Sequence, residues 1–422
     1  MAHFRDVLKK RNFFLLWLGQ IISQLGDRLN QMALIGFIAQ RSPGETFELA
    51  TLLSFTIMPV FVVGPIAGVY VDRWDRRKTM YVCDFLRGLL VLCIPVFVMN
   101  RNLPVVWLYL AVFLLFSIGR FFVPAKMAIV PDLVDKDQLL LANSLVNTTG
   151  MIAATFGFAI GGIIVAVLGV KGGFYIDSAS FFISSLLIFF INIKSKSNIK
   201  IGALSKEIVE VIRKSVFSEV KEGVVYVLRQ TQMRTVIGTL FLVWAALGAV
   251  YVVIIVFIQS TLKSFTLDLG LLIMFLGIGL FSGSLIYGRF GKTSNCFQTI
   301  HSSLFVSGLA LAAFAFFLEK MPYFYTAAFL VFIFGAVVAP IMTATNTLVH
   351  DVATDKMRGK VFSSIEVVMH LAFLMFMLLG SSLAEIKKIG RGNFLIAVGI
   401  LISAIGLVSY LRLKVKELSK QF

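Results

Sequence analysis

The chain has 422 residues; 58% of them are hydrophobic and 14% are charged, and the mean hydropathy is +0.91. This composition excludes a water-soluble enzyme, because charged residues make up about a quarter of an ordinary soluble chain. The net charge of +17 could indicate a nucleic-acid partner, but the basic residues lie in short groups between apolar runs, without interleaved base-stacking aromatics. We therefore expect a membrane protein that binds no nucleic acid.

Reading the chain with a window of about 19 residues predicts twelve membrane-spanning helices and an all-α polytopic fold. The predicted spans cover residues 13–39, 47–71, 79–99, 104–123, 142–168, 173–193, 236–258, 268–287, 297–318, 323–348, 361–384 and 393–413.

The sequence lacks the short motifs of common enzymes and metal sites. Its cysteines (Cys83, Cys93 and Cys296) form no CxxC pair, and it contains no HExxH, GxSxG or GxxxxGKS motif. We expect no disulfide framework, no metal site, no cofactor, no ATP hydrolysis and no enzymatic activity.

Basic residues predict the orientation of the spans. The two termini and every second loop carry 27 of the 39 Lys and Arg residues, whereas the opposite loops carry eight. Because positive charge accumulates on the cytoplasmic side, both termini are predicted to be cytoplasmic.

One long polar stretch, residues 194–234, divides the chain into predicted bundles at 1–193 and 235–422. Its apolar residues recur at near-helical spacing from Leu204 to Val224, which favours a helix lying on the inner membrane surface.

The two halves also resemble each other. Gly64 and Gly68 have counterparts in Gly279 and Gly283 at an offset of 215, and Pro124 has one in Pro340 at an offset of 216. The offsets predict two pseudo-symmetric six-helix bundles, a parallel repeat known from transporters.

Polar residues inside predicted spans are candidates for function. Gln20, Gln24, Asp27 and Gln31 recur on one stripe of the first span, with Arg28 beside it. Asp27 lies roughly 21 Å along this helix, near the middle of the bilayer, where an unpaired charge is costly. It could carry protons, or form a structural ion pair with Arg28 or Arg120.

Span eleven and the end of span four hold further candidates. Glu366 and His370 are four residues apart and could relay protons, or be solvated and packed residues. Arg120 and Lys126 could attract an anionic group or extend to the interface.

A charged cluster follows span two: Gly68-Val-Tyr-Val-Asp72-Arg73-Trp-Asp75-Arg76-Arg77-Lys78. It resembles the G-x-x-x-D-R-x-G-R-R-K loop of the major facilitator superfamily, with Asp75 in place of the usual glycine. The resemblance implies a cytoplasmic gate that closes through Asp72 and the arginines, and we add Asp84 and Arg87 from span three. The predicted gate residues are Gly68, Asp72, Arg73, Arg76, Arg77, Asp84 and Arg87.

Further motifs narrow the resemblance. Gly157, Gly161 and Gly162 are placed like the glycine motif of antiporters, with Phe158 where proline is usual. The stretches 121–126, 142–145 and 174–181 resemble the branch that contains macrolide efflux pumps, the enterobactin exporter and, more distantly, the lysophospholipid transporter.

The resemblance implies a monomeric, proton-coupled transporter in a bacterial-type inner membrane that exports a small amphipathic organic compound by alternating access. A lipid flippase of the same fold is the alternative, and a non-transporting receptor is a further one. The site for substrate or protons is expected to include Gln24, Asp27, Arg28, Gln31, Arg120, Glu366 and His370, and membrane lipids are expected partners.

Overall fold

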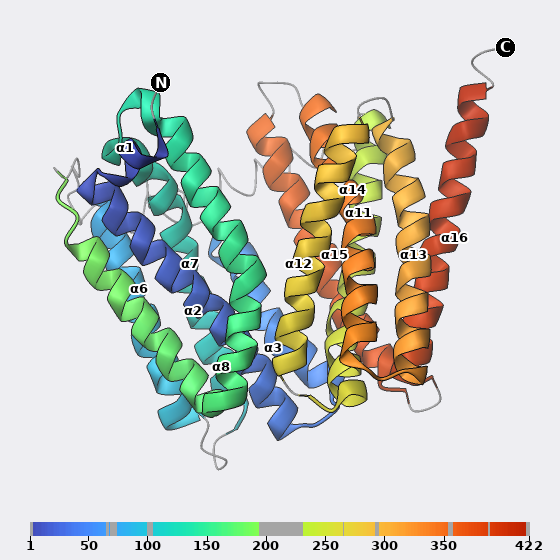
Figure 1. The fold of residues 1–422 in the computed structure, drawn as a ribbon, viewed down its shortest axis with the longest axis horizontal. Coiled ribbons are helices and arrows are strands. Elements are labelled where there is room, and N and C mark those ends of the chain that lie inside the picture. Colours follow the sequence, from blue (N-terminus) through green and yellow to red (C-terminus); the bar gives the residue numbers. More distant parts are fainter. Residues whose placement is uncertain are drawn as a thin grey trace. The chain divides into compact units, whose positions relative to one another are not determined.

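The computed structural model describes residues 3–64, 67, 74–98, 104–193, 231–264, 266–291, 295–352, 358–386 and 389–418. Within these ranges the chain is helical and contains no strand (Figure 1). The predicted all-α fold is confirmed, and eleven of the twelve predicted spans coincide with a described helix or part of one. The second predicted span, 47–71, covers the helices Thr46–Ile57 and Pro59–Val62 and continues outside the described residues. Residues 194–230, with the predicted surface helix, lie outside the described ranges.

The helices of the amino-terminal half are mostly long. They are α1 (Phe4–Leu8), α2 (Arg11–Arg41), α3 (Thr46–Ile57), α4 (Pro59–Val62), α6 (Arg76–Cys93) with a π-helical extension η1 (Ile94–Val98), α7 (Val106–Leu133), the 3-10 turn η2 (Lys136–Gln138) and α8 (Leu139–Phe189). The carboxyl-terminal half contains α11 (Thr231–Leu262), α12 (Leu267–Phe290), α13 (Cys296–Lys320), α14 (Phe324–Val352), α15 (Arg358–Ala384) and α16 (Arg391–Leu418).

Two helices differ from the predicted segments in an informative way. α8 contains both the fifth and the sixth span, because its only interruption is Gly169, with φ +75° and ψ 172°. This is a conformation that glycine adopts without a steric penalty. α7 continues through Pro124 and Pro131, about ten residues beyond the predicted end at 123. Membrane helices tolerate proline because neighbouring groups satisfy the freed carbonyls.

Contacts divide the chain into two units. The first consists of the described residues within Met1–Gln40 and Leu52–Phe217, and the second of those within Arg41–Thr51 and Ser218–Phe422. The short segment Arg41–Thr51, between α2 and the body of α3, therefore groups with the carboxyl-terminal helices.

The helix pairs are equivalent in the two units, which supports the duplicated six-helix unit. In the second unit α12 packs along α14, α13 along α16 and α11 along α15. In the first, α4 contacts α7 and α6 packs along α8. Gly161 of α8 meets Leu29 of α2, so the first span packs on the fifth as the seventh packs on the eleventh.

Glycines allow these close approaches. A Cβ atom on Gly283 of α12 would lie 2.2 Å from the main-chain oxygen of Ala336 in α14, and one on Gly279 would lie 2.2 Å from that of Phe332. Both glycines were singled out from the repeat, and the structure explains them by helix–helix contact.

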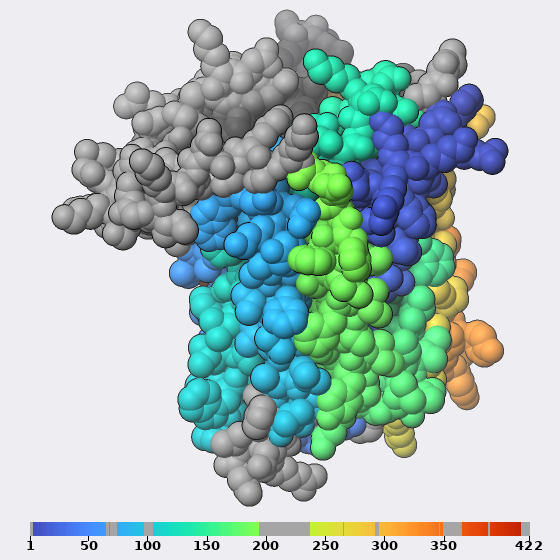
Figure 2. All heavy atoms as spheres, turned by 90° about the vertical axis from the view of Figure 1, so that its left-hand side faces the viewer, coloured from blue at the N-terminus to red at the C-terminus, as the bar shows by residue number. Residues whose placement is uncertain are grey.

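The outer faces of the first unit are apolar. Figure 2 shows α6 (light blue) and the second half of α8 (green) side by side, covering this face with side chains. Among the exposed side chains are Phe85, Leu86 and Leu89 of α6 and Leu186 and Phe189 of α8. Apolar residues outside and polar residues inside are the arrangement expected of a protein surrounded by lipid.

Candidate functional site

A polar network joins three helices inside the first unit. Oδ1 of Asp27, near the midpoint of α2, accepts a 2.5 Å hydrogen bond from Nη2 of Arg87 on α6. Nη1 of Arg87 lies 3.7 Å from Oδ1 of Asp84, one helical turn earlier. Oδ2 of Asp84 accepts a 2.6 Å hydrogen bond from the hydroxyl of Ser184 in the second half of α8. Asp27 is thus paired, and its partner is Arg87.

The members of this network differ in accessibility. Asp84 is fully buried and Arg87 is buried, whereas the side chain of Asp27 is 34% exposed. Asp27 is therefore the most accessible of these three charged groups.

Local sequence explains why α6 presents these groups. Its first turn is capped by Asp75, whose Oδ1 accepts a 2.9 Å hydrogen bond from the backbone N–H of Lys78. An acid at the usual glycine position thus begins the helix. Asp84 and Arg87, three residues apart, lie on the same buried face of α6, opposite the exposed side chains of Phe85, Leu86 and Leu89.

A second polar group adjoins the first, and the sequence analysis did not identify it. Nδ2 of Asn30 on α2 donates a 2.8 Å hydrogen bond to Oδ2 of Asp177 on α8, which is fully buried. Oδ1 of Asp177 lies 3.3 Å from the hydroxyl of Ser180. The available signal was an acid within an apolar run, in the family-like stretch 174–181.

Gly26 brings α2 against this second group. A Cβ atom there would lie 2.0 Å from Oγ of Ser180 and 2.4 Å from Oδ1 of Asp177. Any larger residue next to Asp27 would separate α2 from α8.

The network contains more acidic than basic groups. Asp27, Asp84 and Asp177 are grouped around Arg87, which also lies 4.0 Å from the ring centroid of Phe181. Lys126 of α7 interacts electrostatically with Asp27 and Asp84. Since uncompensated charge is costly away from water, such a cluster is suited to exchanging a proton or a charged group at its accessible member.

The predicted polar stripe of the first span has two faces. Gln24 faces Gly150 in the first half of α8, and Arg28 donates a 3.2 Å hydrogen bond to Oε1 of Gln31. The guanidinium of Arg28 also lies 5.2 Å from the ring centroid of Phe158. Gln24 and Arg28 therefore lie along the first half of α8, whereas Asp27 faces α6.

Two predicted gate residues form a separate cluster at the start of α6. Nη1 of Arg76 donates to Oδ2 of Asp132 on α7 at 2.9 Å, and Nη1 of Arg77 donates to the carbonyl oxygen of Ile191 at 2.6 Å. Arg87 lies roughly 16 Å farther along the helix. The predicted gate residues thus lie in two separate clusters. Arg76 and Arg77 lie at the start of α6, whereas Asp84 and Arg87 belong to the network around Asp27.

The other predicted gate residues, Gly68, Asp72 and Arg73, lie outside the described ranges. Arg120 is half-buried on α7 and follows Gly119, at which a Cβ atom would lie 3.8 Å from Cζ of Arg87.

Glu366 and His370 belong to α15 of the second unit. Nδ1 of His370 is 2.8 Å from the main-chain oxygen of Glu366, and the imidazole stacks on Trp244 at 6.2 Å between centroids. The Glu366 side chain is exposed. These contacts resemble those of His301, whose Nδ1 is 2.7 Å from the Phe297 carbonyl oxygen.

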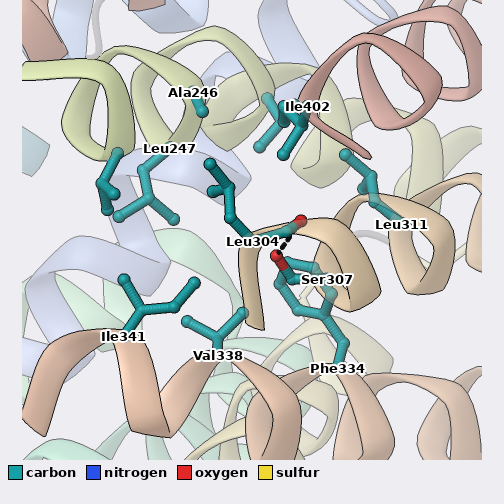
Figure 3. Close-up of a pocket in the computed structure, with 11 residues that line it drawn as sticks. Ala246, Leu247, Leu304, Ser307, Leu311, Phe334, Val338, Ile341 and Ile402 are labelled. Carbon is teal, nitrogen blue, oxygen red and sulfur yellow. Dashed lines mark hydrogen bonds between the residues drawn. The ribbon is translucent and has the colours of Figure 1, made fainter. Parts of the chain in front are cut away.

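A cavity lies among the helices of the second unit (Figure 3). Its volume is about 30 Å³, which is room for about two water molecules. Of the described residues that line it, Ser307 is the polar one, and its hydroxyl bonds the Leu304 carbonyl at 3.1 Å. A cavity this small cannot hold an organic compound of several rings, so it is a packing space.

Comparisons with known proteins agree with this architecture. The family model for the Major Facilitator Superfamily matches residues 16–365. The chain is 25% identical over 405 residues to macrolide efflux protein A of Streptococcus pyogenes, covering 94% of this chain and 95% of the relative. It is 28% identical to the putative bacilysin exporter BacE of Bacillus subtilis (strain 168), covering 85% of each chain. A bacterial homologue of the iron transporter ferroportin, solved in an inward-facing state, shares the fold with a TM-score of 0.69 at 15% identity, over 95% of this chain and 98% of that one.

Proposed function

Since the chain belongs to the major facilitator superfamily, we propose that it is a proton-coupled exporter of amphipathic organic compounds that works by alternating access. The observation that carries the coupling is the ion pair between Asp27 and Arg87 inside the first unit. The names of the relatives, a macrolide efflux protein and a putative exporter of an antibiotic, support export of organic compounds.

Proton exchange at Asp27 would change which partner Arg87 holds. When Asp27 is ionised, Arg87 is shared between Asp27 and Asp84. When Asp27 takes a proton, its attraction for the guanidinium weakens, and the balance shifts toward Asp84. Because Asp27 belongs to α2 and Asp84 to α6, this shift of Arg87 would couple protonation of Asp27 to the contact between the two helices. A transporter with two states requires such a coupling.

The proposal includes an orientation and a location. The excess of Lys and Arg in alternate loops and at the termini supports cytoplasmic termini, and the bacterial relatives support a bacterial-type inner membrane. The gate at residues 68–77 would then face the cytoplasm, with Arg76 holding Asp132 of the same unit.

The decisive variant is Asp27→Asn, which removes the charge and the titration at nearly constant volume. We expect uptake driven by a pH gradient to fall to the rate measured without a gradient, while compound binding persists and loses its pH dependence. Purified protein in liposomes is tested with a macrolide, a small peptide antibiotic and a lysophospholipid, each with and without the gradient. A lysophospholipid moved in preference to the other compounds would support a lipid flippase instead.

A purely structural ion pair predicts a different result for the same variant. Loss of Asp27 would leave Arg87 undercompensated inside the unit, so the melting temperature and the expression would fall. Gradient-driven uptake per folded molecule would stay at the wild-type level. Wild-type values for uptake, binding and melting temperature would contradict both roles.

A further inference from the structure

The segment Arg41–Thr51, here called the clasp, is attached to helices of the carboxyl-terminal half. It groups with the second unit, although the residues up to Gln40 and from Leu52 belong to the first. The chain therefore passes from one unit to the other and back within the eleven residues of Arg41–Thr51. Motion of one unit relative to the other must move the clasp with the second unit or detach it.

The clasp is bound to the end of α15 by Thr46 and Phe47. The hydroxyl of Thr46 lies 3.0 Å from the carbonyl oxygen of Ser381 and 3.0 Å from Oε1 of Glu385. The same Oε1 accepts a 2.6 Å hydrogen bond from the backbone N–H of Phe47. Glu385 thus satisfies the first turn of α3, whose free N–H groups favour a negative charge.

A second attachment reaches the start of α16. Arg391 donates to the carbonyl oxygen of Gly44 through Nη2. Gly44 has φ +86°, and a Cβ atom there would lie 3.2 Å from this nitrogen, so glycine suits both the turn and the approach of the guanidinium. Two charged side chains of opposite sign, Glu385 and Arg391, therefore hold successive parts of the clasp.

The contacts of the clasp include buried residues, but the groups that form them can also form hydrogen bonds to water. Thr46 and Ser381 are fully buried. A main-chain N–H, a hydroxyl, a carboxylate and a guanidinium all form hydrogen bonds to water once they are exposed, so detachment exchanges bonds and leaves none unsatisfied. Such an attachment is specific when closed and can open reversibly.

We propose that the clasp is a releasable latch of the transport cycle, with Glu385 as the residue that holds it. It is attached to α15 and α16 in this structure and detaches in the alternate state. This inference rests on the proposed alternating access. The loops at this end carry few basic residues, so the proposed orientation places the latch on the outer side, opposite the gate at residues 68–77.

Ser381→Cys provides a reporter. The side chain is buried beside the Thr46 contact, and its hydroxyl has no hydrogen-bond partner among the described residues, so the change to sulfur removes no bond. In full-length protein with Cys83, Cys93 and Cys296 replaced by serine, a water-soluble maleimide should label this position slowly.

Variants of the clasp should increase the labelling rate. Thr46→Val removes the hydroxyl, whose single proton is shared between the Ser381 carbonyl oxygen and Oε1 of Glu385, at nearly constant volume and should raise the rate at least about tenfold. Glu385→Ala should do the same, and Glu385→Gln, which keeps an acceptor, should have a smaller effect. The matched control is Thr51→Val, because the Thr51 hydroxyl bonds the Phe47 carbonyl of its own helix at 2.8 Å.

The outcomes separate the latch from the transport function. Equal labelling of the Thr46→Val and Thr51→Val proteins would overturn the latch. If the Thr46→Val protein unfolds, the labelling rates of the Thr46→Ser and Glu385→Gln proteins provide the test. The latch predicts that Thr46→Ser labels at the rate of the parent protein and that Glu385→Gln labels faster. Any other pair of labelling rates contradicts the latch. Faster labelling of the latch variants, with no compound moved by the parent protein in liposomes, would support the latch and overturn only the proposed exporter.

Discussion

Arg87 holds two carboxylates from one position on α6. Its Nη2 and Nη1 atoms are directed to Asp27 and Asp84, and its guanidinium lies against Phe181. A planar group with a fixed fork of donors suits this geometry better than the flexible ammonium of lysine. The residue is therefore central to the network even though Asp27 is its accessible member.

Replacing Arg87 alone should lower the stability of the protein far more than replacing Arg87 and Asp27 together. Arg87→Met leaves the three acids without their closest positive charge, and we expect a loss of about 3–5 kcal/mol. The double variant Asp27→Asn, Arg87→Met should lose less stability than the sum of the losses in the two single variants. The reason is that the carboxylate left without Arg87 is replaced by a neutral amide in the double variant. Unfolding of the purified variants in detergent measures this difference.

Lys78→Met serves as the control for the Arg87 variants. Lys78 lies on the same helix and is exposed, so its replacement should change stability by less than about 0.5 kcal/mol. Strict additivity of Asp27→Asn and Arg87→Met would show that the two side chains do not stabilise each other.

At the scale of single helices, close packing depends on where glycine lies. Gly283 and Gly288 both belong to α12, yet a Cβ atom on Gly283 would collide with the backbone of α14, whereas one on Gly288 would meet no atom within 4 Å. The two glycines therefore provide a test of α12–α14 packing and its control on the same helix.

We expect Gly283→Ala to lower stability by about 1–3 kcal/mol, because the backbone of α14 cannot yield without moving the helix. Gly288→Ala should be neutral or slightly stabilising, since alanine favours a helix. Melting temperatures of the two variants in the same detergent provide the comparison. Equal melting temperatures would mean that α12 and α14 do not pack as closely as the structure indicates.

Sequence predicted the helices well because lipid imposes long apolar runs on them. It missed the end of α7, since a proline at 124 predicts a helix end in water but not where neighbouring helices satisfy the freed carbonyl. Asp27 was identified because a charge in an apolar span needs an explanation. Arg87 was identified as a gate residue but not as the partner of Asp27, and the contact between Asn30 and Asp177 was not identified, because these pairs are 60 and 147 residues apart. Such pairing depends on which helices pack together, and periodicity within one helix carries no information on that.

For the whole molecule, the two six-helix units of the superfamily fold require that residues 194–230 connect them on one side of the membrane. The proposed orientation places this connection with both termini in the cytoplasm. In that orientation we expect its basic residues, among them Lys206 and Lys214, to favour the anionic inner surface.

Cysteines placed at positions 206 and 214 in a cysteine-free protein test this orientation. An impermeant maleimide added to intact cells should leave both unlabelled, and the same reagent should label them once the cells are opened, because the reagent does not cross the membrane. A cysteine at Lys171, in the turn between the fifth and sixth spans, should label from outside. The reverse pattern would invert the assigned topology.

The break at Gly169 also bears on how the protein is made. The fifth and sixth spans are joined by a turn in which one residue leaves the helical conformation, with Lys171 as its nearby charge. During biosynthesis the two spans therefore need to carry almost no polar chain across the bilayer. They can leave the translocation machinery together as a preformed helical hairpin, whereas the acid of the sixth span, Asp177, has its hydrogen-bond partner Asn30 in the first span, which the ribosome makes earlier.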